Sequence, residues 1–238
     1  IYILVEFTDK THTLTSGNLT PVVVDQLDDY YQEASFGTAH VTGTTTAWLD
    51  LGNPRSYYVV GTSYPSDQSE ELVYDAIALA DPWVDFSSYQ VVVILHAGRG
   101  QEESEDWKDY WSCAWSELNV STDHGVSITD AIVCPEMRDA SQIIAVGVFA
   151  HELGHYLGLP DLYDVDYLQR FVDHWCLMAS GSWNGPLREG ESPAHMMGYC
   201  KAKLGYVGGV HLLSVSSSDH SEFVEPLENP PSPTGVQL

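Results

Sequence analysis

The stretch VFAHELGHYLGLPDLYD, residues 148–164, contains a His-Glu-x-x-His array followed by Gly-Leu-Pro-Asp. In a helix, residues four apart lie on one face, so His151 and His155 can direct both imidazole rings at one metal ion. Glu152, next to the first histidine, would face the open coordination position of that ion, where a carboxylate can accept a proton from water. This spacing predicts a metal site, with Glu152 as the candidate general base.

The residues that follow the array suggest a third ligand. Gly158 permits the left-handed backbone conformation that ends a helix, so the chain can turn back towards the two histidines. Asp161 comes three residues later, and we expect it to be the third protein ligand in preference to Glu189 or Glu191. The alternative is that Asp161 caps the next turn, as aspartates after proline often do.

Composition limits the classes of protein to consider. The chain has 238 residues, 44% of them hydrophobic, which suffices for one large domain or a domain with two lobes. Nine basic residues oppose 34 acidic ones, and the formal net charge of −25 would repel nucleic-acid phosphates and anionic lipid headgroups. We therefore expect no nucleic-acid partner, and no apolar run approaches the ~20 residues of a membrane span. The charge favours solubility, and a preference for cationic substrates is the alternative.

Hydrophobic periodicity predicts strands and helices that alternate along the first half of the chain. The expected strands are 2–7, 39–51, 89–98 and 126–134, and the expected helices are 21–35 and 70–81. A long helix should begin at Asp139 or Ser141, either of which can cap it, and end at Gly158. After an irregular segment, a helix is expected near 192–205.

Four cysteines form an even set without a Cys-x-x-Cys pair, which favours two disulfides over a zinc ribbon or a redox centre. Proximity in the sequence predicts the pairs Cys113–Cys134 and Cys176–Cys200. The chain begins in IYILVEF without a signal-peptide pattern. We therefore expect that any targeting or pro-segment has been removed or lies outside this sequence.

The array resembles the zinc signature of the metzincin metalloproteases in its aspartate form, and in particular that of the immune inhibitor A (M6) family of secreted peptidases. Four other segments are similar to family segments in the same order, so the resemblance covers roughly residues 1–207. They are DDYYQEASFGTAHVTGTTTAW (28–48), YQVVVILHAGRGQEES (89–104), CLMASGSW (176–183) and SPAHMMGYCKAKLGYV (192–207).

This resemblance implies a two-lobed α/β catalytic domain with a twisted, mostly parallel sheet. Residues 1–158 would form the N-terminal lobe with the active-site helix, and 159–225 a smaller C-terminal lobe. In the second lobe, Met178 would lie in a methionine turn beneath the zinc. The proline-rich end, 226–238, is expected to be a linker or a disordered tail.

The implied activity is that of a secreted zinc endopeptidase, in which water activated by the metal and by Glu152 attacks the peptide bonds of protein substrates. A prodomain that has been removed is a further expectation of the resemblance. The alternatives are a metallo-aminopeptidase, a catalytically silent binding module, and a structural zinc site closed by Cys176. Calcium could bind the acidic segment 161–167, although a solvated surface loop is the simpler interpretation.

Overall fold

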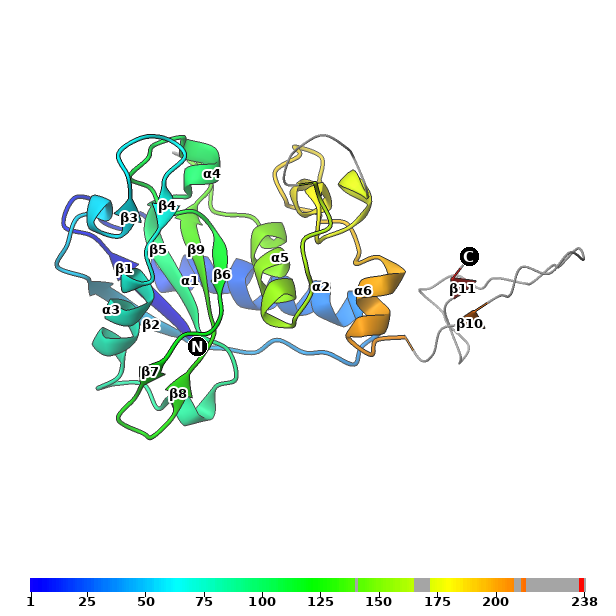
Figure 1. Cartoon of the computed structure of the whole chain (residues 1–238), viewed down its shortest axis with the longest axis horizontal. Helices are drawn as coiled ribbons and strands as arrows, with labels where there is room; N and C mark the ends of the chain where they lie inside the picture. Colours follow the sequence, from blue (N-terminus) through cyan, green and yellow to red (C-terminus); the bar gives the residue numbers. More distant parts are fainter. Residues whose placement is uncertain (140, 165–171, 208–210, 213–235, 238) are drawn as a thin grey trace, which may run out of the picture.

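A five-stranded β-sheet forms the centre of the N-terminal part of the molecule (Figure 1). The computed structural model describes residues 1–139, 141–164, 172–207, 211–212 and 236–237. The strands lie in the order β2-β1-β5-β9-β6; β1, β2, β5 and β9 are parallel, and β6 at the edge is antiparallel to β9. This arrangement confirms the expected mixed α/β domain with a mostly parallel sheet. The strand bounds are β1 (Tyr2–Glu6), β2 (Thr45–Asp50), β5 (Val93–Arg99), β6 (Cys113–Trp115) and β9 (Ala131–Met137).

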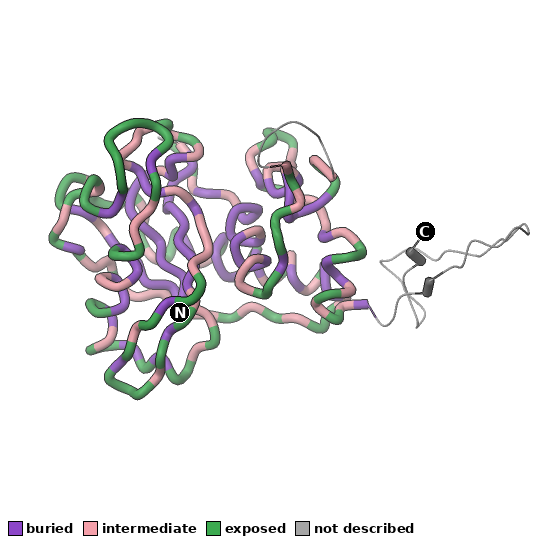
Figure 2. Tube along the Cα trace, viewed as in Figure 1, coloured by how far each residue is buried: buried purple, intermediate pink, exposed green. Residues whose placement is uncertain are grey.

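Each face of the sheet buries its own hydrophobic core. The central strands are largely buried along their length (Figure 2). Successive side chains of a strand point to opposite faces, so in β1 Leu4 lies in one core and Ile3 in the other. The Ile3 side is covered by α3 (Glu71–Ala80), and the Leu4 side by α2 (Leu27–Ala34) and α5 (Val146–Tyr156). The helix with the metal-site array therefore packs directly on the sheet.

The first helical segment is longer than the predicted 21–35. The α-helix α1 (Ser16–Thr20), the π-helical η1 (Pro21–Gln26) and α2 follow one another without a break. The other short elements of the N-terminal part lie in the connections between the main strands and helices. They are η2 (Arg55–Tyr57), β3 (Val59–Val60), β4 (Asp67–Gln68), η3 (Phe86–Ser88), α4 (Gln101–Ser104), β7 (Val120–Ser121) and β8 (Ser127–Ile128).

The start of the active-site helix differs from the prediction. Neither Asp139 nor Ser141 caps α5, which begins at Val146. Asp139 instead closes a local turn, in which its carboxylate accepts the backbone N–H of Ser141 at 2.7 Å. Ile143 then forms an antiparallel bridge with Met137 at the end of β9. This pairing holds the chain extended for several residues, so the helix can begin only after it.

The C-terminal part packs against the side of α5 that faces away from the sheet (Figure 1). It contains the 3₁₀ helices η4 (Asp173–Trp175) and η5 (Ser180–Trp183), and α6 (Gly198–Lys203), which is shorter than the predicted helix 192–205. The tail has the two-residue strands β10 (His211–Leu212) and β11 (Val236–Gln237). The expected lobe boundary at 225 and most of the expected tail 226–238 lie outside the described residues. Within the described parts of the chain, no helix has the length and apolar character needed to cross a membrane.

Candidate metal centre

Helix α5 is held on both sides, which fixes the position of the His-Glu-x-x-His array. On one side, Tyr31 Oη of α2 donates a 2.9 Å hydrogen bond to the backbone oxygen of Ala150. On the other side, Gly147 allows the backbone of the C-terminal part to approach closely. A Cβ at this position would lie 1.9 Å from the carbonyl oxygen of Ser182. The array is therefore supported by both parts of the structure.

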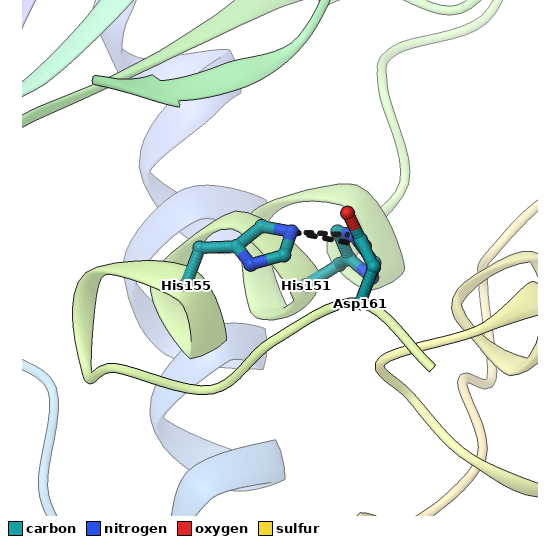
Figure 3. Close-up of side chains that lie close together, drawn as sticks. All are labelled: His151, His155 and Asp161. Carbon is teal, nitrogen blue, oxygen red and sulfur yellow. Dashed lines mark hydrogen bonds and ion pairs between the residues drawn. The ribbon is translucent and has the colours of Figure 1, made fainter. Parts of the chain in front are cut away.

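Three side chains converge on one point at the surface of α5 (Figure 3). His151 Nε2 and His155 Nε2 are 3.1 Å apart. Asp161 Oδ1 lies 3.2 Å from the first nitrogen and 3.1 Å from the second. The three atoms thus form a nearly equilateral triangle. Among the described residues, this is the only group of three or more histidine, cysteine, aspartate or glutamate side chains whose ligand atoms are close enough to share a metal ion.

The hydrogen bonds of the two imidazole rings explain why a cation belongs at this point. His151 Nδ1 lies 2.9 Å from the carbonyl oxygen of Leu177, and His155 Nδ1 lies 2.9 Å from that of Leu159. A carbonyl only accepts, so each Nδ1 donates, and in the neutral ring each Nε2 then carries a lone pair. Two lone pairs and a carboxylate oxygen pointing at one another repel unless a positive charge lies between them.

The dimensions of the triangle fit zinc. Ligand atoms at 2.0–2.1 Å from a tetrahedral zinc ion are about 3.3 Å apart. The separations of 3.1 and 3.2 Å between the three donor atoms are close to that value. Two imidazoles and one carboxylate also leave a fourth position open, as in catalytic zinc sites. The residues present therefore suit a zinc ion of the catalytic kind.

The loop after α5 brings Asp161 back to the histidines. Gly158 has φ +88°, the left-handed conformation expected at the helix end, and its N–H donates to the carbonyl oxygen of His155 at 2.8 Å. Next to Asp161, the N–H of Leu162 donates to the carbonyl oxygen of Met178 at 2.7 Å. The chain is thus held on both sides of the aspartate, which restricts where its carboxylate can lie.

The electrostatics of the three side chains favour positive charge at the centre of the triangle. Burial opposes protonation of His155, but the hydrogen bonds with Asp161 and the Leu159 carbonyl outweigh it and raise the pKa of His155 to about 9. Burial likewise works against ionisation of Asp161, yet hydrogen bonds from the two histidines hold the pKa of its carboxyl well below the usual range. A proton supplies this positive charge here, and a metal cation would replace it.

Glu152 is a buried carboxyl beside the triangle. Only 7% of the residue is exposed, and it lines the same cleft as both histidines and Asp161. Burial raises the pKa of Glu152 to about 7, against the opposing effect of His151 and His155. A carboxyl with a pKa near neutrality can both accept and release a proton at physiological pH, which is the property that a general base of hydrolysis requires.

Met178 lies directly beneath the helix that carries the histidines. Its side chain is fully buried, and a Cβ on Gly154 would come within 2.4 Å of its Sδ. The same turn supplies the Leu177 carbonyl that orients His151. Met178 therefore lies on the inner side of the site, and its role as the residue of a methionine turn stays a prediction.

A broad cleft surrounds the site. Its volume of about 1190 Å³ exceeds the ~300–1,000 Å³ of a typical small-molecule pocket and suits a polymer chain. The edge strand β6 contributes to one wall, while η4 and η5 contribute to the other. Among the described residues, no lysine or arginine lines it. The acidic residues that line it are Glu102, Glu103, Asp130, Glu152, Asp161, Asp164 and Asp173.

The two alternative carboxylates have other partners. Glu189 forms an ion pair with Arg138, and Glu191 accepts the backbone N–H of Leu187 at 2.5 Å. Neither belongs to the group of side chains that could share a metal ion with the histidines. The structure thus brings Asp161 to the site, and not Glu189 or Glu191.

The four cysteines are free thiols, so neither predicted disulfide is present. Cys113 pairs with Val133 of the next strand, and its side chain packs on the same core as Val133, whereas Cys134 lies in the opposite core. A bridge through the sheet between them is therefore geometrically unsuitable. Cys176 and Cys200 share one core, and their thiols form a hydrogen bond that lowers the pKa of Cys176 to about 6.

Two further metal hypotheses can be compared with the structure. Cys176 Sγ accepts the backbone N–H of Met197 at 3.5 Å and is not a member of the metal-binding group, so it does not close the site as a fourth ligand. The calcium hypothesis concerned residues 161–167, of which 165–167 lie outside the described residues.

Glu102 is one of the acidic cleft residues that reasoning from the sequence missed. It lies in α4, directly after β5, and its partly buried side chain lines the cleft. In α/β proteins, ligand-binding residues lie at the carboxyl ends of parallel strands. The position of Glu102 shortly after the apolar strand 89–98 could therefore have indicated a place in the site.

The fold and the site together define the class of this protein: a metzincin-like α/β peptidase domain with a mostly parallel sheet and a helix-borne His-Glu-x-x-His array. Comparison with known proteins then shows which family this chain resembles. Residues 92–209 match the family described as immune inhibitor A peptidase M6, catalytic domain.

Two curated proteins are also similar to this chain. The chain is 28% identical to Immune inhibitor A of Bacillus thuringiensis subsp. alesti, in an alignment that covers 69% of this chain and 29% of the relative. It is 26% identical to Pre-pro-metalloprotease PrtV of Vibrio cholerae serotype O1, over 76% of this chain and 23% of the relative. The chain thus spans less than a third of the length of either relative.

Proposed function

We propose that this chain is the catalytic domain of a secreted zinc endopeptidase that hydrolyses peptide bonds within proteins. The observation that carries the proposal is the convergence of His151, His155 and Asp161 on one point beside the buried carboxyl of Glu152. The match of residues 92–209 to the M6 peptidase family and the relative named as a metalloprotease support the metal-dependent peptidase class. Secretion rests on the resemblance to a family of secreted peptidases.

In this proposal, His151, His155 and Asp161 hold the metal, and the carbonyls of Leu177 and Leu159 orient the two imidazoles. When bound, zinc supplies a Lewis acid that polarises a carbonyl group and lowers the pKa of water from 15.7 to about 7. Glu152 takes up the proton of the attacking water at its carboxylate and returns it to the leaving amine. Its burial excludes bulk water from the carboxylate and keeps its pKa near 7.

The cleft supports an extended peptide substrate. Strand β6 is the edge strand of the sheet, and Cys113, Ala114 and Trp115 all line the cleft. An extended peptide can add to such an edge through main-chain hydrogen bonds, which do not depend on its side chains. This mode places the middle of a chain at the site, as endopeptidase action requires.

Glu152→Gln tests the proposal with the least change in shape. The zinc-loaded variant should keep close to one zinc per chain and lose about 100-fold or more in turnover of an N-acetylated, internally quenched peptide. A chelator should abolish the wild-type activity, and added zinc should restore it. Cleavage of unblocked peptides alone would instead identify an aminopeptidase, and zinc binding without any cleavage would identify a silent binding module.

A further inference from the structure

Glu102 is a carboxylate built into the wall of the cleft. Ser112 Oγ donates to one of its oxygens, and the Ser112 N–H donates to the other at 3.2 Å. Gly100 makes room for this arrangement, because a Cβ there would lie 2.4 Å from Oε1 of Glu102. The carboxylate is thus held in place before any ligand binds. Such preorganisation favours binding, because no side-chain entropy has to be lost when the ligand arrives.

The charge of Glu102 has no counterpart in the described parts of the chain. No ion pair of the described residues includes Glu102, and no lysine or arginine among them lines the cleft. A carboxylate that is partly withdrawn from water is stabilised by a nearby cation, since desolvation of its charge is costly. A carboxylate accepts about four hydrogen bonds, and Ser112 accounts for two, which leaves acceptor positions for a ligand.

The place of Glu102 in the fold points to the class of ligand. Ser112, its hydrogen-bond partner, immediately precedes β6, the edge strand along the cleft. A peptide extended along β6 therefore passes the Glu102 carboxylate within a few residues of the metal centre. Every second side chain of such a peptide points to the same side, so one of them can be directed at Glu102.

We propose that Glu102 is a specificity residue that binds a lysine or arginine side chain of the substrate, close to the scissile bond. This inference rests on the proposed peptidase function. The net charge of −25 alone would not support it, because surface carboxylates serve solubility in any acidic protein. Glu102 differs from these, because it is partly buried, held by two hydrogen bonds and lines the cleft.

The experiment compares pairs of quenched peptides that differ only in one lysine, which is either free or Nε-acetylated. The lysine is moved through three positions on each side of the scissile bond, and kcat/KM is measured with the zinc-loaded wild-type chain. At one position at least, the free lysine should be preferred about tenfold or more, the scale of a charge-assisted hydrogen bond. Acetylation keeps the aliphatic stem, so the ratio isolates the charge.

The variant Glu102→Gln should reduce that ratio towards one, whereas Glu105→Gln should leave it at the wild-type value. Glu105 lies at the end of the same helix but is exposed and does not line the cleft. A ratio near one at every position in the wild type would overturn the inference even if the variant failed to fold. An unchanged ratio in Glu102→Gln would overturn it as well. Absence of all cleavage by the wild type would instead contradict the proposed function.

Discussion

Gly154 should be a sensitive position of the active-site helix, although it is not itself part of the chemistry. It lies between the two histidines and faces Met178, whose side chain is fully buried. In Gly154→Ala, the new Cβ would be 2.4 Å from Sδ and 3.2 Å from Cε of Met178. Carbon atoms in contact prefer about 3.5–4.0 Å, so the thioether must move by about 1 Å or more in a packed core.

This displacement reaches the metal centre through two hydrogen bonds. The turn that holds Met178 presents the Leu177 carbonyl to His151 at 2.9 Å, and Met178 itself accepts the N–H of Leu162, next to Asp161, at 2.7 Å. Overpacking of a core typically costs about 1–3 kcal/mol of stability. Disturbing the partners that orient metal ligands typically costs about 10–100-fold in metal affinity or activity. Gly154→Ala should therefore lose both stability and zinc affinity.

Urea unfolding of the metal-free chain measures the first loss, and competition with a fluorescent chelator measures the second. The matched control is Gly198→Ala, at the start of α6, where a Cβ would meet nothing within 4 Å. It should be neutral or stabilising by less than about 1 kcal/mol. Met178→Ala should destabilise the Gly154→Ala variant less than it destabilises the wild type, because the shorter side chain no longer clashes with the new Cβ. If Gly154→Ala behaved like the control in both assays, the contact with Met178 would not support the site.

Three other changes have expected outcomes. Asp161→Ala should weaken zinc binding by several kcal/mol by chelator competition, while Glu191→Ala should keep wild-type affinity; the reverse result would place the third ligand elsewhere. Burial raises the pKa of Glu102, so the folded state binds more protons and stability falls as the pH rises through the folded pKa. The Tm of Glu102→Gln should thus exceed that of the wild type at pH 8, and the two Tm values should be similar near pH 4. A difference in Tm that does not depend on pH would contradict the reasoning. The buried Glu136 accepts hydrogen bonds from the backbone N–H groups of Thr13, Leu14 and Gly98. Glu136→Ala should therefore lower the free energy of unfolding in urea by about 2–5 kcal/mol. A loss below about 1 kcal/mol would show that water replaces the carboxylate.

Where sequence and structure agree, the features depend on short-range geometry. The apolar strands of the first half and the helix 70–81 follow from periodicity, and the structure places them as β1, β5 and α3. The convergence of His151 and His155 follows from four-residue spacing on a helix, and Gly158 ends that helix in the expected left-handed conformation. Asp161 then has only a short loop to cross. The whole arrangement lies within one continuous segment, so its geometry can be inferred without knowledge of the fold.

Where they differ, residues distant in sequence decide the outcome. The start of α5 was misplaced because Ile143 pairs with Met137, and such a bridge overrides the capping tendency of Asp139. The disulfide prediction assumed that cysteines close in sequence are also close in space, but Cys113 and Cys134 lie in opposite cores.

The sequence alone thus determined the metal-site array and the class of fold. Only the tertiary structure decided which groups surround that array. The register of β6 against β9 assigned Cys113 and Cys134 to opposite faces of the sheet. The Leu177 carbonyl reaches His151 from 26 residues away, and Glu102 enters the cleft from the end of β5. Local spacing fixes the direction of a side chain within its own element, whereas contacts between elements depend on how the sheet and helices pack.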